Sequence, residues 1–356
     1  MNDQSPLAQT LGIMSQALRD AGAGDAPKLS LEALKTFIAQ PDIPAPPAPA
    51  MLEHDDGVYF GLPEDEYHSD PAFGSSDMKK LATNPASWWF GSKFNPNREE
   101  QEQTPSQFFG TALHKCILEG RLAFEAKYAP ADFPGNIKAG IEERKAIIAS
   151  GKLPVKRDDW TRIQTAGATV RANPHLAEAF SNGQPEVSIF WTDTSGIRKK
   201  ARIDFLKIRA SVDVKTASNE RDIAFPLACR AALASYRYDA QATHYHDARA
   251  AMPALVASGA VHGEHDPAWL QRVCAVEEWA SVIVFIQSKG APLVYPVSIS
   301  PGNPIIEVAR VLLRQAEENY REWAGRFGLD TPWVLVDPVE ELMMDDLPYY
   351  FARKTP

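Results

Sequence analysis

Hydrophobic and polar residues alternate with a period of two in the middle of the chain, a pattern that predicts β-strands. The first group of predicted strands covers residues 186–193, 198–208 and 211–217. Because only the turn sequence "TSG" separates the first two, they are expected to form a hairpin. Residues 281–288 and 291–300 are two further apolar segments on either side of a Lys-Gly turn. They predict a second hairpin.

Apolar residues at helical spacing lie on either side of these strands. In the segment "SQFFGTALHKCILEG", Phe109, Leu113, Cys116 and Ile117 fall on one face, and Gly120 marks the expected end of the helix. Further helices are predicted over residues 136–181 with a break near "GKLP", over 230–252 and over 305–326. The order of helix, three strands, helix, two strands and helix predicts an α/β fold with a small sheet between helices.

The first 57 residues differ in pattern from the rest of the chain. Residues 1–40 predict two short amphipathic helices, an N-terminal helical appendage. Residues 41–57 contain the proline-rich stretch "PDIPAPPAPA". Proline cannot continue a helix and favours an extended backbone, so this segment is expected to be a linker. The main domain is expected to span residues 58–356.

Composition narrows the class of protein. Hydrophobic residues make up 44% of the chain and charged residues 23%, as in globular proteins. Three scattered cysteines argue against a disulfide framework and against a zinc or iron–sulfur site, since no CxxC pair occurs. No signal sequence and no long apolar run are found, so the chain is not expected to enter a membrane. A cytoplasmic location is expected.

Charge is unevenly distributed along the chain. The net charge of −9 is unlike that of a passive nucleic-acid coat protein. Residues 196–209, however, hold six basic side chains and one acid, a local charge of +5. We therefore expect contacts with DNA phosphates from four of them, Arg198, Lys199, Lys200 and Arg202. The alternative is that these side chains form a solvated strand face.

Two acids and a lysine lie in this basic region and in the strand that follows it. Asp213 and Lys215 point the same way on their strand, and Asp204 points away from the apolar neighbours Ile203 and Phe205. If the apolar faces of both strands turn inward, the three polar side chains converge. Two adjacent carboxylates repel one another unless a cation lies between them, and Mg²⁺ prefers such oxygen ligands. A cross-strand Asp–Lys pair on a solvated face is the alternative interpretation.

Two helices offer further polar side chains. His114 lies off the apolar stripe of its helix, on the side of Gly110, where the helix could approach a metal closely. Gln241 and Tyr245 are spaced i, i+4 and share a helix face, so an amide and a phenol could point at a phosphate or a base edge. Each of these residues could instead be an ordinary core or surface residue.

Taken in order, these motifs resemble a known family. The series "GTALH" (110–114), Glu186, Asp204, "DVK" (213–215) and Gln241-x-x-x-Tyr245 resembles the PD-(D/E)XK nuclease superfamily. Within that superfamily it is most similar to the RecB-type branch and to phage or prophage exonuclease VIII (RecE-like) domains. The segment "YHSDPAFGSSDMKKLATNPASWW" is similar to the entry segment of those domains. The resemblance covers roughly residues 58–330.

The resemblance implies a fold and a set of site residues. The fold would be a small mixed central sheet flanked by helices. The cofactor would be Mg²⁺, with Mn²⁺ as the alternative. The metal ligands would be His114, Asp204, Asp213 and the backbone carbonyl of Val214. Lys215 would be the catalytic lysine, supported by Glu186, Gln241 and Tyr245. An aspartate in the x-K motif, where some relatives have glutamate, leaves this chemistry unchanged.

The resemblance also implies an activity. RecE-like members degrade linear double-stranded DNA from the 5′ end as homo-oligomeric rings and pass the remaining 3′ strand to a single-strand annealing protein. This chain would then be a 5′-to-3′ exonuclease for phage or prophage recombination or DNA processing, acting in the cytoplasm of a bacterial host.

Other interpretations remain open from the sequence. A PD-(D/E)XK endonuclease of restriction or repair would share the same motifs. A DNA-binding module without activity would lack an acid or the lysine, and none is missing here. No GxxxxGK[ST] phosphate loop occurs, so no helicase motor is expected. A zinc site is disfavoured because "HYH" in a helix points its two histidines apart; its candidate ligands are His244, His246, His262 and His265.

Overall fold

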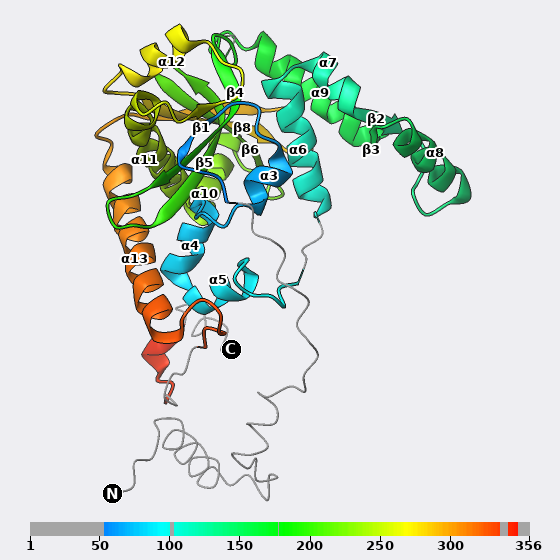
Figure 1. The fold of residues 1–356 in the computed structure, drawn as a ribbon. Helices are drawn as coiled ribbons and strands as arrows, with labels where there is room; N and C mark the ends of the chain where they lie inside the picture. The colour runs from blue at the N-terminus through cyan, green and yellow to red at the C-terminus, as the bar shows by residue number, and fades with distance from the viewer. Residues whose placement is uncertain (1–52, 100–102, 177, 335–340, 348–356) are drawn as a thin grey trace, which may run out of the picture. The chain divides into compact units, whose positions relative to one another are not determined.

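The structure is a computed structural model that describes residues 53–99, 103–176, 178–334 and 341–347. The predicted N-terminal helices, residues 1–40, and most of the predicted linker lie outside the described residues. Residues 49–332 form one compact unit, and this unit contains the sheet and the helices that position the candidate site (Figure 1). The division of the chain at residues 40 and 57 stays a prediction.

A seven-stranded mixed sheet lies at the centre of this unit, in the order β7-β1-β4-β5-β6-β8-β9. The β6/β8 and β1/β7 pairs are parallel and the others antiparallel. The strands are β1 (Gly57–Tyr59), β4 (Gly183–Thr192), β5 (Arg198–Lys207), β6 (Ala210–Ala217), β7 (Val261–His262), β8 (Ala280–Gln287) and β9 (Val294–Ile299). All five predicted strands and both predicted hairpins are confirmed. β1 and β7 were missed because strands of two or three residues are too short to show alternation.

Helices cover both faces of the sheet (Figure 1). On one face, α6 (Pro105–Leu118) and α9 (Arg157–Ala172) enclose a core with Phe205, Val212 and Val214. On the other, α11 (Tyr238–Ala257) and α12 (Pro267–Cys274) enclose a core with Val187 and Ile203. The remaining helices are α3 (Glu64–Ser69), α4 (Ser75–Thr83), α5 (Pro85–Gly91), α7 (Arg121–Lys127), α8 (Lys138–Ala149), α10 (Phe225–Tyr236) and α13 (Pro304–Phe327). A short 3-10 turn spans Met344–Asp346.

Two predicted helices are interrupted in the structure. The helix expected over residues 230–252 is two helices, α10 and α11, because Arg237 between them adopts the left-handed conformation. The break near "GKLP" is a strand, β3 (Leu153–Lys156), which pairs in parallel with β2 (Tyr128–Ala131) through the crossover helix α8. The break near "GKLP" was predicted and is confirmed, whereas the break at Arg237 does not follow from hydrophobic periodicity, because residues 230–252 keep a helical pattern.

The strands β5 and β6 part soon after they begin to pair. β4 and β5 are paired at nine positions along their length, whereas β5 and β6 pair only at Phe205–Val212 and Leu206–Ser211. Continuing that register by one residue would set Asp204 opposite Asp213, and this is where the strands diverge. We call this point the β5/β6 fork. It leaves backbone groups of β6 without ladder partners on the β5 side.

Side-chain alternation is broken beside the fork. Ile203 packs in the α11-side core and Phe205 in the α6-side core, although they lie two residues apart on one strand. Glu186, which lies across from Asp204 on β4, has a positive φ of 53° and is missing from the ladder register. The expectation that Ile203 and Phe205 share one inward face is therefore wrong. Asp204 reaches the site because the strand is distorted and the sheet opens there.

Candidate active site

The fork is held open by two side chains that bond to the backbone of Val214. The Val214 N–H donates to Oδ2 of Asp204 at 2.8 Å. The Val214 carbonyl oxygen lies 2.9 Å from Nε2 of His114 and accepts a hydrogen bond from it when that nitrogen carries a proton. The other ring nitrogen of His114, Nδ1, lies 3.7 Å from Oδ2 of Asp204. Helix α6 and strands β5 and β6 thus meet at one residue, and side chains replace the missing ladder bonds.

Asp213 is oriented from both sides by polar neighbours. Its Oδ1 accepts a hydrogen bond from Nε2 of Gln241 at 2.9 Å, and its Oδ2 lies 2.6 Å from Nζ of Lys215. Gln241 also donates to the hydroxyl of Tyr245 at 2.8 Å. The shared helix face predicted for Gln241 and Tyr245 is confirmed; Gln241 bonds directly to Asp213, and Tyr245 is linked to Asp213 through Gln241. A contact of either with DNA stays a prediction.

Negative charge at the fork is only partly compensated. Asp204 and Asp213 are 8% and 6% exposed. Burial raises the pKa of Asp213; the Lys215 ammonium opposes this and the Asp204 carboxylate adds to it. Burial, followed by repulsion from Asp204, also raises the pKa of Glu186. Burial alone would lower the pKa of Lys215, but Asp213 and Asp204 raise it overall, so its amine stays charged.

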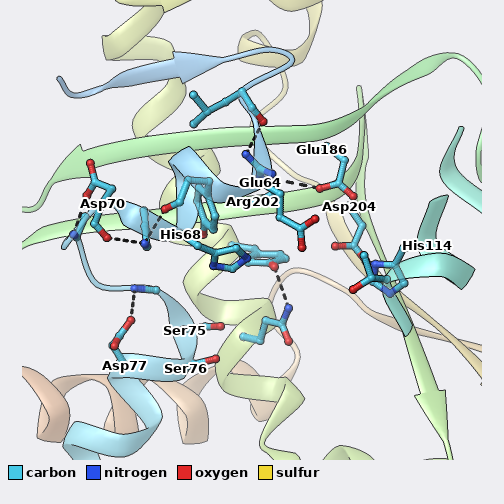
Figure 2. A pocket seen from close by; sticks show the side chains of 18 of the residues that line it. Glu64, His68, Asp70, Ser75, Ser76, Asp77, His114, Glu186, Arg202 and Asp204 are labelled. Carbon is cyan, nitrogen blue, oxygen red and sulfur yellow. Dashed lines mark hydrogen bonds and ion pairs between the residues drawn. The ribbon is translucent and has the colours of Figure 1, made fainter. Parts of the chain in front are cut away.

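Figure 2 shows Glu186, Asp204 and His114 gathered on one side of a cleft, with Ser75 and Ser76 of α4 across from them. The cleft has a volume of about 1160 Å³. Its walls carry both acidic and basic side chains, and the basic ones are Lys79, Lys93, Arg98, Lys115, Lys127, Lys200, Arg202 and Lys215. Asp213 does not line this cleft; it lines a much smaller cavity behind it.

The four cations predicted to contact phosphate separate into two pairs. Lys200 and Arg202 line the cleft, whereas Arg198 and Lys199 do not. Lys199 is 5% exposed and lies 2.7 Å from Asp193 and 2.6 Å from Glu317. The local charge of +5 is therefore not one exposed basic stripe.

Internal contacts also hold the other three cations. Arg198 forms two hydrogen bonds with the buried carboxylate of Asp70, at 2.9 and 3.0 Å. Lys200 donates to two backbone carbonyls, of Tyr67 and Asp70, at 2.8 and 2.7 Å. Arg202 donates to the hydroxyl of Ser188 at 2.9 Å and to the carbonyl of Leu62 at 2.7 Å. Their role as phosphate contacts stays a prediction.

The residues at the fork suit a hard divalent cation. No three histidine, cysteine or carboxylate side chains of the described residues form a ready-made metal cage. Mg²⁺ does not need one, because it is usually held by one or two carboxylates and keeps several waters. Neighbouring ligands about 2.1 Å from an octahedral ion lie about 3.0 Å apart. The 2.9 Å between His114 Nε2 and the Val214 carbonyl oxygen matches that spacing.

The histidines of the alternative zinc site lie apart, each with its own neighbour. His244 is buried, and its Nε2 bonds to the carbonyl of Lys200 at 2.9 Å. The rings of the other three histidines each stack on an aromatic ring: His246 on Trp279, His262 on Tyr59 and His265 on Phe60. The structure gives no support to a zinc site here.

Some residues at the site were missed in the sequence. Glu64 of α3 lies near Arg202 and Asp204 (Figure 2), and its carboxylate contributes to the raised pKa of Glu186. It stands in a turn-rich segment that gives no pattern. Tyr238 places its ring 5.4 Å from Nζ of Lys215. Its position three residues before Gln241, on the same helix face, was a usable signal.

Comparison with known proteins supports the sequence motifs. The model of the PDDEXK-like domain of unknown function (DUF3799) matches residues 74–253. None of the curated proteins matches the sequence. A crystal structure of a "Putative exonuclease" from Eubacterium rectale is similar with a TM-score of 0.46 and 12% identity. The alignment covers 83% of this chain and 99% of that one, and at this score it adds no argument.

No helix in the described part of the chain is long and apolar enough to cross a membrane.

The family match covers half of the chain, and it includes α6 with His114, both strands of the fork and α11 with Gln241 and Tyr245. The mixed α/β architecture with its small central sheet agrees with this assignment. The chain belongs to the PDDEXK-like family and thereby to the PD-(D/E)XK nuclease superfamily.

Proposed function

We propose that this protein is a metal-dependent nuclease that hydrolyses phosphodiester bonds of DNA. The observation behind the proposal is the β5/β6 fork, where three acids, Asp204, Asp213 and Glu186, meet only two cations, Lys215 and Arg202, beside a cleft of about 1160 Å³. Such an excess of buried negative charge is stabilised by a cation. A buried charged cluster in a cleft is also typical of functional sites.

His114, Asp204, Asp213 and the carbonyl of Val214 would hold the ion. When bound, a divalent cation would supply Lewis acidity at a phosphoryl oxygen and would lower the pKa of a water nucleophile. The chain's own residues do the rest. Lys215 lines the cleft with a charged ammonium group. It can offset the negative charge that develops on the phosphate during attack.

Gln241 and Tyr245 act through Asp213 and are positioning residues. The amide of Gln241 fixes Oδ1 of Asp213 while Lys215 holds Oδ2. The carboxylate is therefore oriented before any ligand arrives, which reduces reorganisation during the reaction. Cations along the cleft walls can contact phosphates and make binding sensitive to salt. Glu186 adds a carboxyl group within the cleft itself.

The finer proposal is an exonuclease of the exonuclease VIII (RecE-like) kind. It would use Mg²⁺, or Mn²⁺ as the alternative, and would degrade linear double-stranded DNA in the 5′-to-3′ direction. The order of the motifs from "GTALH" to Gln241-x-x-x-Tyr245 supports this proposal. We further propose a homo-oligomer in a bacterial cytoplasm that works with a single-strand annealing protein during phage or prophage recombination.

The test is degradation of linear duplex DNA labelled at the 5′ or the 3′ end, with and without Mg²⁺. A closed circular duplex and the Asp213→Ala protein are the controls. We expect metal-dependent loss of linear DNA, with the 5′ label released first, no loss of the circle and no activity in the variant. Cleavage of the circle would instead identify an endonuclease of restriction or repair. Binding without cleavage of either substrate would identify a DNA-binding module.

A further inference from the structure

A second, much smaller cavity lies behind the carboxylate of Asp213. Its volume is about 10 Å³, and residues of β6, β8 and α11 line it. Gln241 and Tyr245 line both this cavity and the large cleft, whereas Asp213 lines only the small one. The orienting side chains of the active site therefore form the wall between the two spaces.

Two serine hydroxyls line this cavity without a hydrogen-bond partner among the described residues. They are Oγ of Ser211 on β6 and Oγ of Ser281 on β8. Both residues are buried, with 3% and 5% of their surface exposed. An unsatisfied buried hydroxyl costs about 1–3 kcal/mol, so native proteins rarely keep one without a partner. Two of them beside one cavity indicate a shared partner inside it.

The strand register explains why the hydroxyls and the carboxylate meet. Ser211 is directly paired with Ser281 across the parallel β6/β8 ladder. Side chains alternate along β6, so Ser211 and Asp213 point to the same face, two residues apart. The face is that of α11, where Gln241 contacts Asp213. The serines thus lie next to Asp213, on the side away from Lys215.

A single water molecule fits this space in size and chemistry. A cavity needs roughly 10–15 Å³ of probe-occupied volume to hold one water, and the water needs two to four polar partners. Two hydroxyls and a carboxylate supply both donors and acceptors.

We propose that Ser211 and Ser281 hold one buried water against the carboxylate of Asp213, and that this water positions the carboxylate for metal binding. The inference rests on the proposed function, since it assigns a role within the same site. Asp213 would then be fixed by Gln241, by Lys215 and by the water. Ser211 and Ser281 are positioning residues, because neither lines the cleft where DNA would bind.

The first test is Ser281→Ala, with Ser298→Ala as the matched control on the exposed side of the neighbouring strand β9. If a water is bound, Ser281→Ala removes one of its partners and we expect the melting temperature to fall by about 1–2 °C. A dry cavity predicts the opposite sign, because the substitution would then remove an unsatisfied hydroxyl. A rise in melting temperature would overturn the proposal.

The second test is Ser281→Val, whose added carbon atoms fill the cavity and exclude water. We expect about tenfold weaker Mn²⁺ binding by calorimetry and about tenfold lower kcat, as for lost outer partners of metal ligands. The KM for DNA should not change. A crystal structure at high resolution should show water density within hydrogen-bond distance of both hydroxyls in the wild-type protein and none in the variant.

The two proposals fail in different ways. A wild-type protein that binds Mn²⁺ but cleaves no DNA would overturn the proposed function, while the melting temperatures, calorimetry and water density would still decide the inference. A wild-type nuclease without water density in this cavity, or with unchanged kcat and Mn²⁺ affinity in Ser281→Val, would overturn the inference alone.

Discussion

The two ends of β5 both carry buried charge but arrange it in opposite ways. At the start of the strand, Arg198 and Lys199 are each matched by carboxylates, those of Asp70, Asp193 and Glu317. Toward its end, at the fork, three acids, Asp204, Asp213 and Glu186, face two cations, Lys215 and Arg202. A buried charge that keeps its partner avoids the cost of standing unpaired, whereas charge left unbalanced in a cleft is available to a ligand.

The pKa values of the acids record this difference. Burial acts to raise the pKa of Asp70, but hydrogen bonds from the N–H groups of His54 and Ala72 and the charge of Arg198 lower it overall. Burial raises the pKa of Asp213, and the nearby lysine does not reverse that shift. The charged form of Asp70, beside the start of β5, is thus stabilised, whereas the charged form of Asp213, at the fork, is destabilised.

The largest effect is expected from Arg198→Ala, which leaves the buried carboxylate of Asp70 without its cation. Urea unfolding should show a loss of about 3–5 kcal/mol in the free energy of unfolding. The kcat of the folded fraction should not change. Arg209→Ala, an exposed cation from the same basic segment, is the control and should change stability little. A raised KM for DNA without lost stability would mean that Arg198 contacts the substrate.

Lys215→Ala tests the fork, where the opposite end of β5 meets β6. We expect kcat to fall by about 10²–10³-fold, as when a group that stabilises transition-state charge is removed. The circular dichroism spectrum and the binding of Mn²⁺ should be retained. Lys289→Ala, which removes an exposed lysine, should leave kcat unchanged. An equally active Lys215→Ala protein would remove the lysine from the mechanism.

His244 provides a pH test of the start of β5, where the charges are paired, since its Nε2 bonds to the carbonyl of Lys200. Burial lowers the pKa of His244 from 6.5 to about 4. Between these values the unfolded chain binds a proton and the folded chain does not, so stability falls as the pH is lowered from 6.5 to 4. The expected loss is about 3 kcal/mol.

Unfolding free energies measured across this range should show a smaller loss for His244→Gln than for the wild type. The control is His175→Gln, which changes an exposed histidine and should keep the wild-type slope. Equal slopes for all three proteins would show that folding does not lower the pKa of His244.

The smallest effect concerns DNA binding. Arg98 lines the cleft, so Arg98→Ala should reduce the slope of log K against log salt by about 0.9, the contribution of one phosphate contact. Lys199→Met should leave this slope unchanged, because Lys199 is paired within the fold. The comparison between the two ends of β5 would fail if Lys199 affected the salt slope and Arg98 did not.

Local pattern was sufficient to predict much of the fold and several site residues. Short apolar segments and the turn sequences between them located β4, β5, β6, β8 and β9. The placement of Asp213 and Lys215 on one strand face, and of Gln241 and Tyr245 on one helix face, follows from the strand and helix periodicities. The contact of His114 with Val214 was expected only from the family resemblance.

The rest depends on contacts between distant parts of the chain. Sequence cannot show that Arg198 would find Asp70, 128 residues away. The fork depends on ladder bonds that do not form and on the positive φ of Glu186, a conformation rarely adopted by glutamate. Arg237 interrupts a helix in a conformation that usually requires glycine or asparagine, so no breaker residue marked the position.

The β5/β6 fork also bears on the order in which the chain folds. β4 and β5 are joined by a short turn and can pair early, because closing a short loop loses little entropy. β6 pairs in parallel with β8, for example at Val212–Val282, and a long crossover separates the two strands in the sequence. This pairing is expected to form later, because closing a long loop loses more entropy. Asp204 belongs to the early hairpin and Asp213 to the late pair. We therefore expect the two acids to meet at the end of folding, so that a partly folded chain in the cell is chemically inert.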